Sequence, residues 1–199
     1  MNKSTLRILT LLLVAALGYA PLAHAQMAVL GDRVFTMAGD PIEDGVVLVR
    51  DGKIERVGPA EDIRIPEGYE VVEAAVVTPG LVDAHTVVGI AGFMNQPQDQ
   101  DQVERSNPIQ PDLRAIDAYN PRERLVEWVR SLGVTTIHTG HGPGILMSGQ
   151  TMIVKTHGQT VGEAVIDAET MIAATLGNAA RESQGKSPGT RSKMIAMLR

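Results

Sequence analysis

Residues 76–92 read VVTPGLVDAHTVVGIAG, and this segment is the most informative one for the architecture of the chain. Its first half is almost entirely apolar and does not alternate with polar residues, which is typical of a strand buried on both faces in a parallel sheet. Asp83 and His85 follow where the strand is expected to end. Parallel α/β barrels carry their chemistry at the carboxyl ends of their strands, so His85 is the first candidate site residue.

The surroundings of His85 leave two interpretations open. Zinc binds imidazole nitrogens, and histidines at i and i+2 on a strand point to the same side. Position 87 is a valine, so this pair of ligands does not exist here. His85 is therefore either a metal ligand that lacks its usual neighbour or a hydrogen-bonded structural histidine. Asp83 is expected to hold the His85 ring in position through a hydrogen bond.

The chain after this strand predicts a strand–helix–strand unit. Residues 120–133, NPRERLVEWVRSLG, carry an apolar stripe at helical spacing. Asn120 can cap this helix, Glu123 completes a capping box, and Gly133 can end it. The apolar segment 134–140 follows directly as a strand, and this order of elements is typical of parallel α/β sheets.

Other segments carry weaker patterns. Residues 27–77 hold short strands, with an Asp51-Gly52 hairpin signal, and predict a small antiparallel β unit. The polar segment 93–119 is expected to be functional or disordered. Residues 145–156 predict a hairpin or a third strand. Two more helices are expected, over 168–176 after an Asp167 cap and from Thr190 to the end.

Two further histidines are candidates for the same site. In VTTIHTGH, Ile137 should face the covering helices, so His138 should face the barrel interior. There it either approaches His85 or serves as a polar interior residue or substrate contact. His141 lies in a GHGPG loop whose glycines permit close approach to a ligand, and the alternative is a solvent-facing histidine. His157, beside Gly158, is expected at the surface.

The amino terminus indicates export. Lys3 and Arg7 precede an apolar run at residues 8–17, and AHA at 23–25 provides a cleavage site, which together predict a secretory signal peptide over 1–25. We expect a periplasmic protein that has no membrane span once the signal is removed. Without Lys3 and Arg7, 16 basic and 23 acidic residues leave a net charge of −7. No basic patch or aromatic ladder favours a nucleic-acid partner.

The segments 76–89 and 44–60 (DGVVLVRDGKIERVGPA) resemble the opening of the amidohydrolase superfamily, in particular imidazolonepropionase-like amidohydrolases. The similarity continues through residues 109–122, 131–144 and 148–156. The resemblance implies an α/β fold in which an incomplete (β/α)₈ TIM-type barrel over 78–199 follows a small antiparallel β-sandwich unit over 27–77.

The same resemblance implies an activity and its cofactor. Such a protein would be a metal-dependent hydrolase acting on carbon–nitrogen bonds other than ordinary peptide bonds, with a small-molecule substrate. The divalent metal would be zinc, held by His85, with His138, His141 and Lys155 as weaker candidates. Some relatives carboxylate a strand lysine to bridge two metals, whereas Lys155 can equally be a lysine with a packed stem and a solvated ammonium group.

Two departures from the family pattern qualify this expectation. Val87 occupies the position of a family histidine, and residues 76–199 are fewer than the about 250 residues of such a barrel. We therefore expect an N-terminal part of a longer protein, inactive alone. Two alternatives stay open: a relative with a degenerate metal site that acts as a binding or structural protein, or a small α/β domain complete in itself. The oligomeric state is not predicted.

Overall fold

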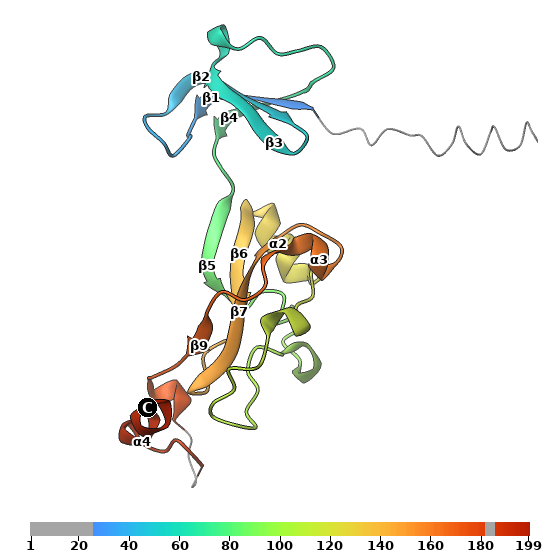
Figure 1. Ribbon diagram of the computed structural model, residues 1–199. Helices are drawn as coiled ribbons and strands as arrows, with labels where there is room; N and C mark the ends of the chain where they lie inside the picture. The colour runs from blue at the N-terminus through green and yellow to red at the C-terminus, as the bar shows by residue number, and fades with distance from the viewer. Residues whose placement is uncertain (1–25, 182–185) are drawn as a thin grey trace, which may run out of the picture. The chain divides into compact units, whose positions relative to one another are not determined.

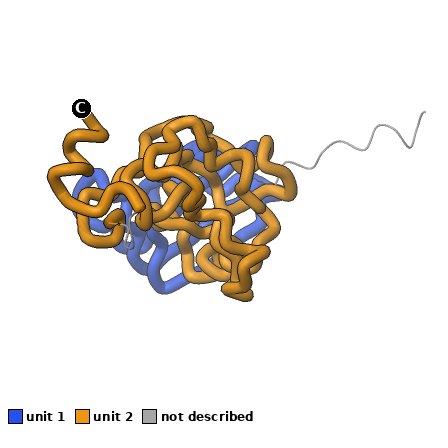
Figure 2. Tube along the Cα trace, turned by 90° about the horizontal axis from the view of Figure 1, so that it is seen from below, with its two compact units in different colours: residues 1–79 blue, residues 80–199 orange. Residues whose placement is uncertain are grey.

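The computed structural model describes residues 26–181 and 186–199, so the predicted signal peptide lies outside the described residues. The chain divides into two compact units between Pro79 and Gly80 (Figure 2). Within the described residues, no helix has the length and apolar character needed to cross a membrane.

Unit 1 is built around one four-stranded sheet of order β3-β2-β1-β4 (Figure 1). Strands β1 and β2, and β2 and β3, pair antiparallel, whereas β1 and β4 pair parallel. The β2–β3 hairpin is confirmed at Asp51-Gly52, where φ is 53° and 73°, as a two-residue turn of the primed type requires. The strands are β1 (Met27–Val34), β2 (Ile42–Arg50), β3 (Lys53–Pro59) and β4 (Glu70–Val77).

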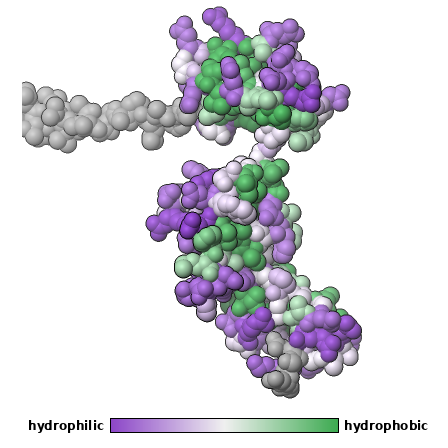
Figure 3. Space-filling view, turned by 180° about the vertical axis from the view of Figure 1, so that it is seen from behind, coloured by the Kyte–Doolittle hydropathy of each residue, from purple (hydrophilic) through white to green (hydrophobic). Residues whose placement is uncertain are grey.

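The predicted antiparallel β-sandwich differs from this arrangement in two ways. The sheet is mixed, and among the described residues of unit 1 no second sheet lies against it. One face is buried by the segment after β3, which contributes Ile63 and Tyr69 to a core with Ala28, Val46 and Leu48. The other face is apolar but exposed, with Ile54 at 68% and Val57 at 38%, and hydrophobic residues lie at the surface of this unit in Figure 3.

Unit 2 begins with the predicted strand–helix–strand unit. Strand β5 (Leu81–Thr86) pairs parallel with β6 (Val134–Gly140), and the connection between them contains helix α2 (Arg124–Ser131). Val126 of the helix and Ile137 of β6 are fully buried in the same apolar cluster. The parallel pair is therefore stabilised from the side that α2 covers. The apolar stripe expected from the sequence is not the buried face, because Trp128 and Leu132 of that stripe are 58% and 60% exposed, whereas Val126 is buried.

The rest of the sheet runs antiparallel and departs from a barrel. Strand β7 (Met147–Lys155) pairs antiparallel with β6, β8 (Val165–Asp167) and β9 (Ile172–Ala174). Residues 141–146 alone connect β6 to β7, and a parallel crossover needs a dozen residues or more. The chain must therefore turn back, and unit 2 contains one strand–helix–strand unit followed by antiparallel strands.

One of the predicted elements is wrong and two are confirmed. The helix predicted over 168–176 is absent, because Thr170 donates to Thr151 O at 2.9 Å and Thr151 donates to Met171 O at 2.8 Å. Pairing with the exposed edge of β7 thus overrides the local helix pattern. Of the two alternatives predicted for 145–156, the third strand is confirmed and the hairpin is not, since β7 passes straight through Ser148-Gly149. Helix α4 (Arg191–Leu198) forms as predicted behind its Thr190 cap.

The polar segment 93–119 is ordered by hydrogen bonds that its backbone N–H groups donate to carboxylates. The acceptors are Asp99 of the segment itself and Glu123 at the start of α2. Helix α2 starts later than predicted, because Glu123 is its N-cap and accepts from Leu125 N. The other oxygen of Glu123 accepts from Phe93 N at 2.8 Å. Short 3-10 turns, η2 (Pro97–Asp99) and η3 (Ala115–Asp117), break the segment, and Tyr119 is buried in the core.

His141 is buried rather than facing solvent, with 5% of its surface exposed. It packs against Gly149 of β7, which has a φ of +136°. A Cβ atom added to Gly149 would lie 2.4 Å from His141 Cδ2 and 2.8 Å from Leu113 O. Burial lowers the pKa of His141, and the Gln102 backbone carbonyl opposes part of this shift.

Gly149→Ala is expected to destabilise unit 2 by about 3 kcal/mol or more, because the new Cβ clashes with a packed ring and a carbonyl and the backbone angle disfavours L side chains. Urea unfolding monitored by fluorescence of Trp128, the one tryptophan of the chain, measures the change. Gly162→Ala is the matched control, since no atom lies within 4 Å of its added Cβ. Equal stability of the two variants would contradict the packing described here.

The buried imidazole also predicts a pH dependence. The folded state keeps His141 neutral at pH values where an unfolded histidine, with a pKa of about 6.5, binds a proton. The free energy of unfolding should therefore fall as the pH decreases through about 6.5, by at most about 1.4 kcal/mol per pH unit. His141→Gln should flatten this slope between about pH 7.5 and 5.5, and His157→Gln should leave it unchanged. A slope that persists in His141→Gln would refute the prediction.

Candidate functional site

The candidate site lies where β5 and β6 end. Because the two strands are parallel, their carboxyl ends meet at one edge of the sheet, with Thr86 level with Thr139. His85 is exposed at this edge, and among the described residues its ring makes no hydrogen bond. The Asp83 carboxylate accepts from the backbone N of His85 at 3.1 Å. Asp83 therefore fixes the backbone at position 85, and its contact with His85 is to the amide rather than to the ring.

His138 uses both of its ring nitrogens within unit 2. Nδ1 lies 3.1 Å from Ala84 O on β5, and a carbonyl can only accept, so this nitrogen carries the hydrogen. Nε2 lies within hydrogen-bonding distance of two hydroxyls, 2.7 Å from Thr151 Oγ1 and 2.8 Å from Thr170 Oγ1. The His138 ring thus links β5 to β7 and to the segment before β9. Metal binding by His138 would require these contacts to break.

Of the other two predicted ligands, His141 follows directly after β6 and Lys155 is the last residue of β7. Neither ring nitrogen of His141 has a hydrogen-bond partner, and both are closed off from solvent. Lys155 is level with Thr136 at the beginning of β6, and its Nζ donates to Thr136 Oγ1 at 3.1 Å. Because β7 runs antiparallel to β6, Lys155 lies at the opposite end of the sheet from the Thr86–Thr139 pair.

The positions of these four side chains show whether the described residues could bind a metal ion. Across residues 26–181 and 186–199, no group of three or more histidine, aspartate or glutamate side chains could hold one. His85 is exposed at the carboxyl edge, His138 is engaged, and His141 is enclosed. The described residues by themselves therefore do not form a complete metal site, and His85 is the candidate ligand that remains accessible.

Val87, which occupies the position of the family histidine, faces a cavity instead. The loops that follow β5 and β6 enclose a cavity of about 450 Å³. Ligands of α/β sheets bind outside the carboxyl ends of the strands, so this cavity is well placed for a substrate. The sequence pattern predicted the segment 93–119 to be functional or disordered and indicated none of the residues that it contributes to this cavity. The lining comprises Val87, Gln100, Gln102, Val103, Arg105, Gly142 and Pro143.

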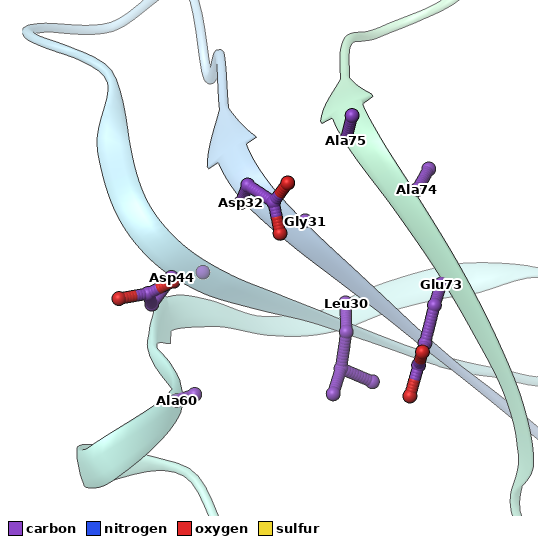
Figure 4. A pocket seen from close by; sticks show the side chains of 9 residues that line it. Leu30, Gly31, Asp32, Asp44, Ala60, Glu73, Ala74 and Ala75 are labelled. Atoms are coloured by element: carbon purple, nitrogen blue, oxygen red, sulfur yellow. The ribbon is translucent and has the colours of Figure 1, made fainter.

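Unit 1 contains a separate cavity of about 490 Å³ (Figure 4). Asp32 of β1, Asp44 of β2 and Glu73 of β4 contribute carboxylates to its lining, beside small residues such as Gly31 and Ala74. These three carboxylates do not form a group that could hold a metal ion. The residue patterns singled out in the sequence gave no signal for this cavity.

No family model matches the chain. Among curated proteins, the imidazolonepropionase of Solibacter usitatus is 29% identical over 133 residues, which are 58% of this chain and 32% of that protein. The imidazolonepropionase of Idiomarina loihiensis is 31% identical over 120 residues, or 52% of this chain and 29% of the relative. The chain thus spans about a third or less of the length of these relatives.

A solved structure extends the similarity to most of the chain. An amidohydrolase from Thermotoga maritima matches with a TM-score of 0.79 and 26% sequence identity, over 86% of this chain and 45% of the other. The matched part includes far more than the segment around His85, and a further sequence relative, from Hapsidospora irregularis, is also named amidohydrolase; it is 29% identical over 138 residues, which are 65% of this chain and 14% of that protein. The chain is therefore a member of the amidohydrolase superfamily.

Proposed function

We propose that the protein hydrolyses a carbon–nitrogen bond, other than an ordinary peptide bond, in a small-molecule substrate. The observation that carries this proposal is the match to the Thermotoga maritima amidohydrolase over 86% of the chain. Relatives in sequence are named imidazolonepropionase and amidohydrolase. The exposed His85 and the cavity of about 450 Å³ at the carboxyl ends of β5 and β6 support the same activity.

The proposal includes a divalent metal ion, which we assign as zinc. When bound, such an ion lowers the pKa of a coordinated water and polarises a scissile carbonyl. His85 is the ligand we name, because its ring is exposed at the carboxyl end of β5 without a hydrogen-bond partner among the described residues. Since no other described side chain converges with it, we derive no catalytic step through the ion.

A second candidate function is binding without catalysis, and Val87 favours it. Its side chain lines the cavity where a metal ligand would be expected from the family pattern, so a protein with a degenerate metal site would retain the cavity. One equivalent of zinc in the purified full-length protein would exclude this alternative.

We propose that the protein acts in the periplasm. The basis is the signal-peptide pattern of residues 1–25, and these residues lie outside the described part of the structure.

In the full-length protein, His85→Ala is expected to reduce bound zinc and to lower amide turnover by about 100-fold or more, because it removes a metal ligand. Elemental analysis and an assay on a panel of small amides measure the two effects. The 199-residue chain, assayed in parallel, is expected to turn over no substrate. His157→Ala is the control, since His157 is exposed beyond the end of β7. Full zinc content and unchanged turnover in His85→Ala would disprove the role of His85.

A further inference from the structure

We propose that His138 is a positioning residue for His85: together with Asp83, it holds a one-residue β-bulge in β5 that turns the His85 ring out of the covered face of the sheet. The proposal rests on the proposed function, in which His85 is the ligand named at the carboxyl end of β5. It gives His138 a role at this edge that does not require its ring to bind a metal ion.

The bulge appears in the register of the two parallel strands. Asp83 is paired with Ile137, and the next pair along the strands is Thr86 with Thr139. Strand β5 thus advances three residues between these pairs while β6 advances two, so β5 contains one extra residue. In this described part of the sheet, the two residues between Asp83 and Thr86 have no partner on β6. Bulges are over-represented next to active sites, where they change the direction of a side chain.

The extra residue determines which way His85 faces. In a regular pair that continued from Asp83 and Ile137, His85 would be level with Thr139, and paired side chains lie on the same face of a sheet. That face is covered, because Ile137 packs in the core cluster with α2 and both Ile137 and Thr139 are 0% exposed. With the bulge, Thr86 is level with Thr139 and His85 is exposed. A shift of one residue moves a side chain to the opposite face, so the bulge makes His85 accessible.

Two side chains hold the peptide group at the centre of the bulge. His138 Nδ1 lies 3.1 Å from the backbone oxygen of Ala84, and this nitrogen is the donor because a carbonyl can only accept. The Asp83 carboxylate accepts from the backbone nitrogen of His85 at 3.1 Å. The carbonyl of Ala84 and the N–H of His85 belong to one planar peptide group. This group is therefore bound at both ends, and its orientation fixes where the His85 side chain begins.

The His138 ring is itself held in place on its other side. Its Nε2 lies 2.7 Å from Thr151 Oγ1 and 2.8 Å from Thr170 Oγ1. The two hydroxyl oxygens are 3.0 Å apart, and Thr170 Oγ1 donates to Thr151 O at 3.1 Å. A side chain that is fixed by hydrogen bonds behind it can position its neighbour with little freedom. The position of Nδ1, and with it the Ala84 carbonyl, is therefore set from β7.

Two substitutions at position 138 separate the two sides of the ring. In His138→Asn the amide nitrogen is bonded to Cγ, as Nδ1 is, so it can still donate to Ala84 O, but it does not reach the threonine hydroxyls. In His138→Gln the nitrogen lies one bond further out, near the place of Nε2. The Asn variant therefore preserves the contact with the bulge, and the Gln variant preserves the contact with β7.

The test measures the accessibility of His85 in the 199-residue chain, with a chelator present so that no metal masks the ring. Diethyl pyrocarbonate acylates accessible imidazoles, and mass spectrometry gives the rate at each histidine. We expect His138→Gln to lower the acylation rate of His85 by about tenfold or more, because the ring turns towards the covered face. His138→Asn is expected to stay within about twofold of the unmodified chain, since the donor to Ala84 O remains.

The other histidines of the chain supply the controls. His157 is exposed beyond the end of β7 and is the reference rate in every variant. His141 is 5% exposed and should stay unmodified as long as unit 2 is folded. A second pair acts on the other end of the peptide group: Asp83→Asn keeps an acceptor for His85 N, whereas Asp83→Ala removes it and should lower the rate at His85. This pair decides the question if His138→Gln does not fold.

An unchanged rate at His85 in both His138→Gln and Asp83→Ala would overturn the proposal. An equal loss in His138→Asn and His138→Gln would also overturn it, because the ring would then act as a structural cross-link to β7. In the full-length protein, turnover of small amides should follow the same order as the acylation rates. Acylation in the expected order without turnover by the unmodified full-length protein would refute the proposed function alone, and turnover with unchanged acylation would refute the positioning role alone.

Discussion

The parallel pairing of β5 with β6 is the constraint on which the functional part of the chain depends. It brings the ends of two strands that are about fifty residues apart in sequence to one edge of a sheet. Helix α2 makes this pairing stable by covering it with Val126 against Ile137. His138 adds a cross-link, because its ring bonds to a β5 carbonyl on one side and to Thr151 of β7 on the other. The exposed His85 and the cavity lined by Val87 both lie at this edge of the sheet.

The antiparallel direction of β7 determines which candidate ligands lie near the carboxyl ends of β5 and β6. A connection of residues 141–146 forces β7 to run antiparallel, and this direction places Lys155 beside the start of β6 rather than its end. The same return brings Gly149 against His141, so the imidazole is enclosed and its nitrogens have no partner. One short connection thus places Lys155 at the opposite end of the sheet from His85 and leads to the enclosure of His141.

The polar segment between β5 and α2 lines two cavities of unit 2. It supplies Gln100, Gln102 and Arg105 to the cavity beside Val87, and Arg105 also lines a second cavity with Lys186. Its order comes from side-chain acceptors: Asp99 accepts from Met94 N and Gln96 N, and these bonds, together with the one from the Gln100 side chain, lower the pKa of Asp99. A rigid polar segment over a strand edge provides fixed donors for a ligand at small cost in conformational entropy.

The sequence by itself determined the features that depend on neighbouring residues. The Asp51-Gly52 hairpin, the strand–helix–strand order around α2 and the Thr190 cap of α4 follow from local turn chemistry, apolar periodicity and capping. The segments between residues 44 and 156 that resemble amidohydrolases, taken together, indicated the superfamily. Tertiary structure alone decided the direction of β7, the strands in place of a helix over 168–176, and the burial of His141. These three features depend on hydrogen bonds between residues that are distant in sequence. One example is the bond that Thr170 N donates to Thr151 O, which the local residue pattern does not predict.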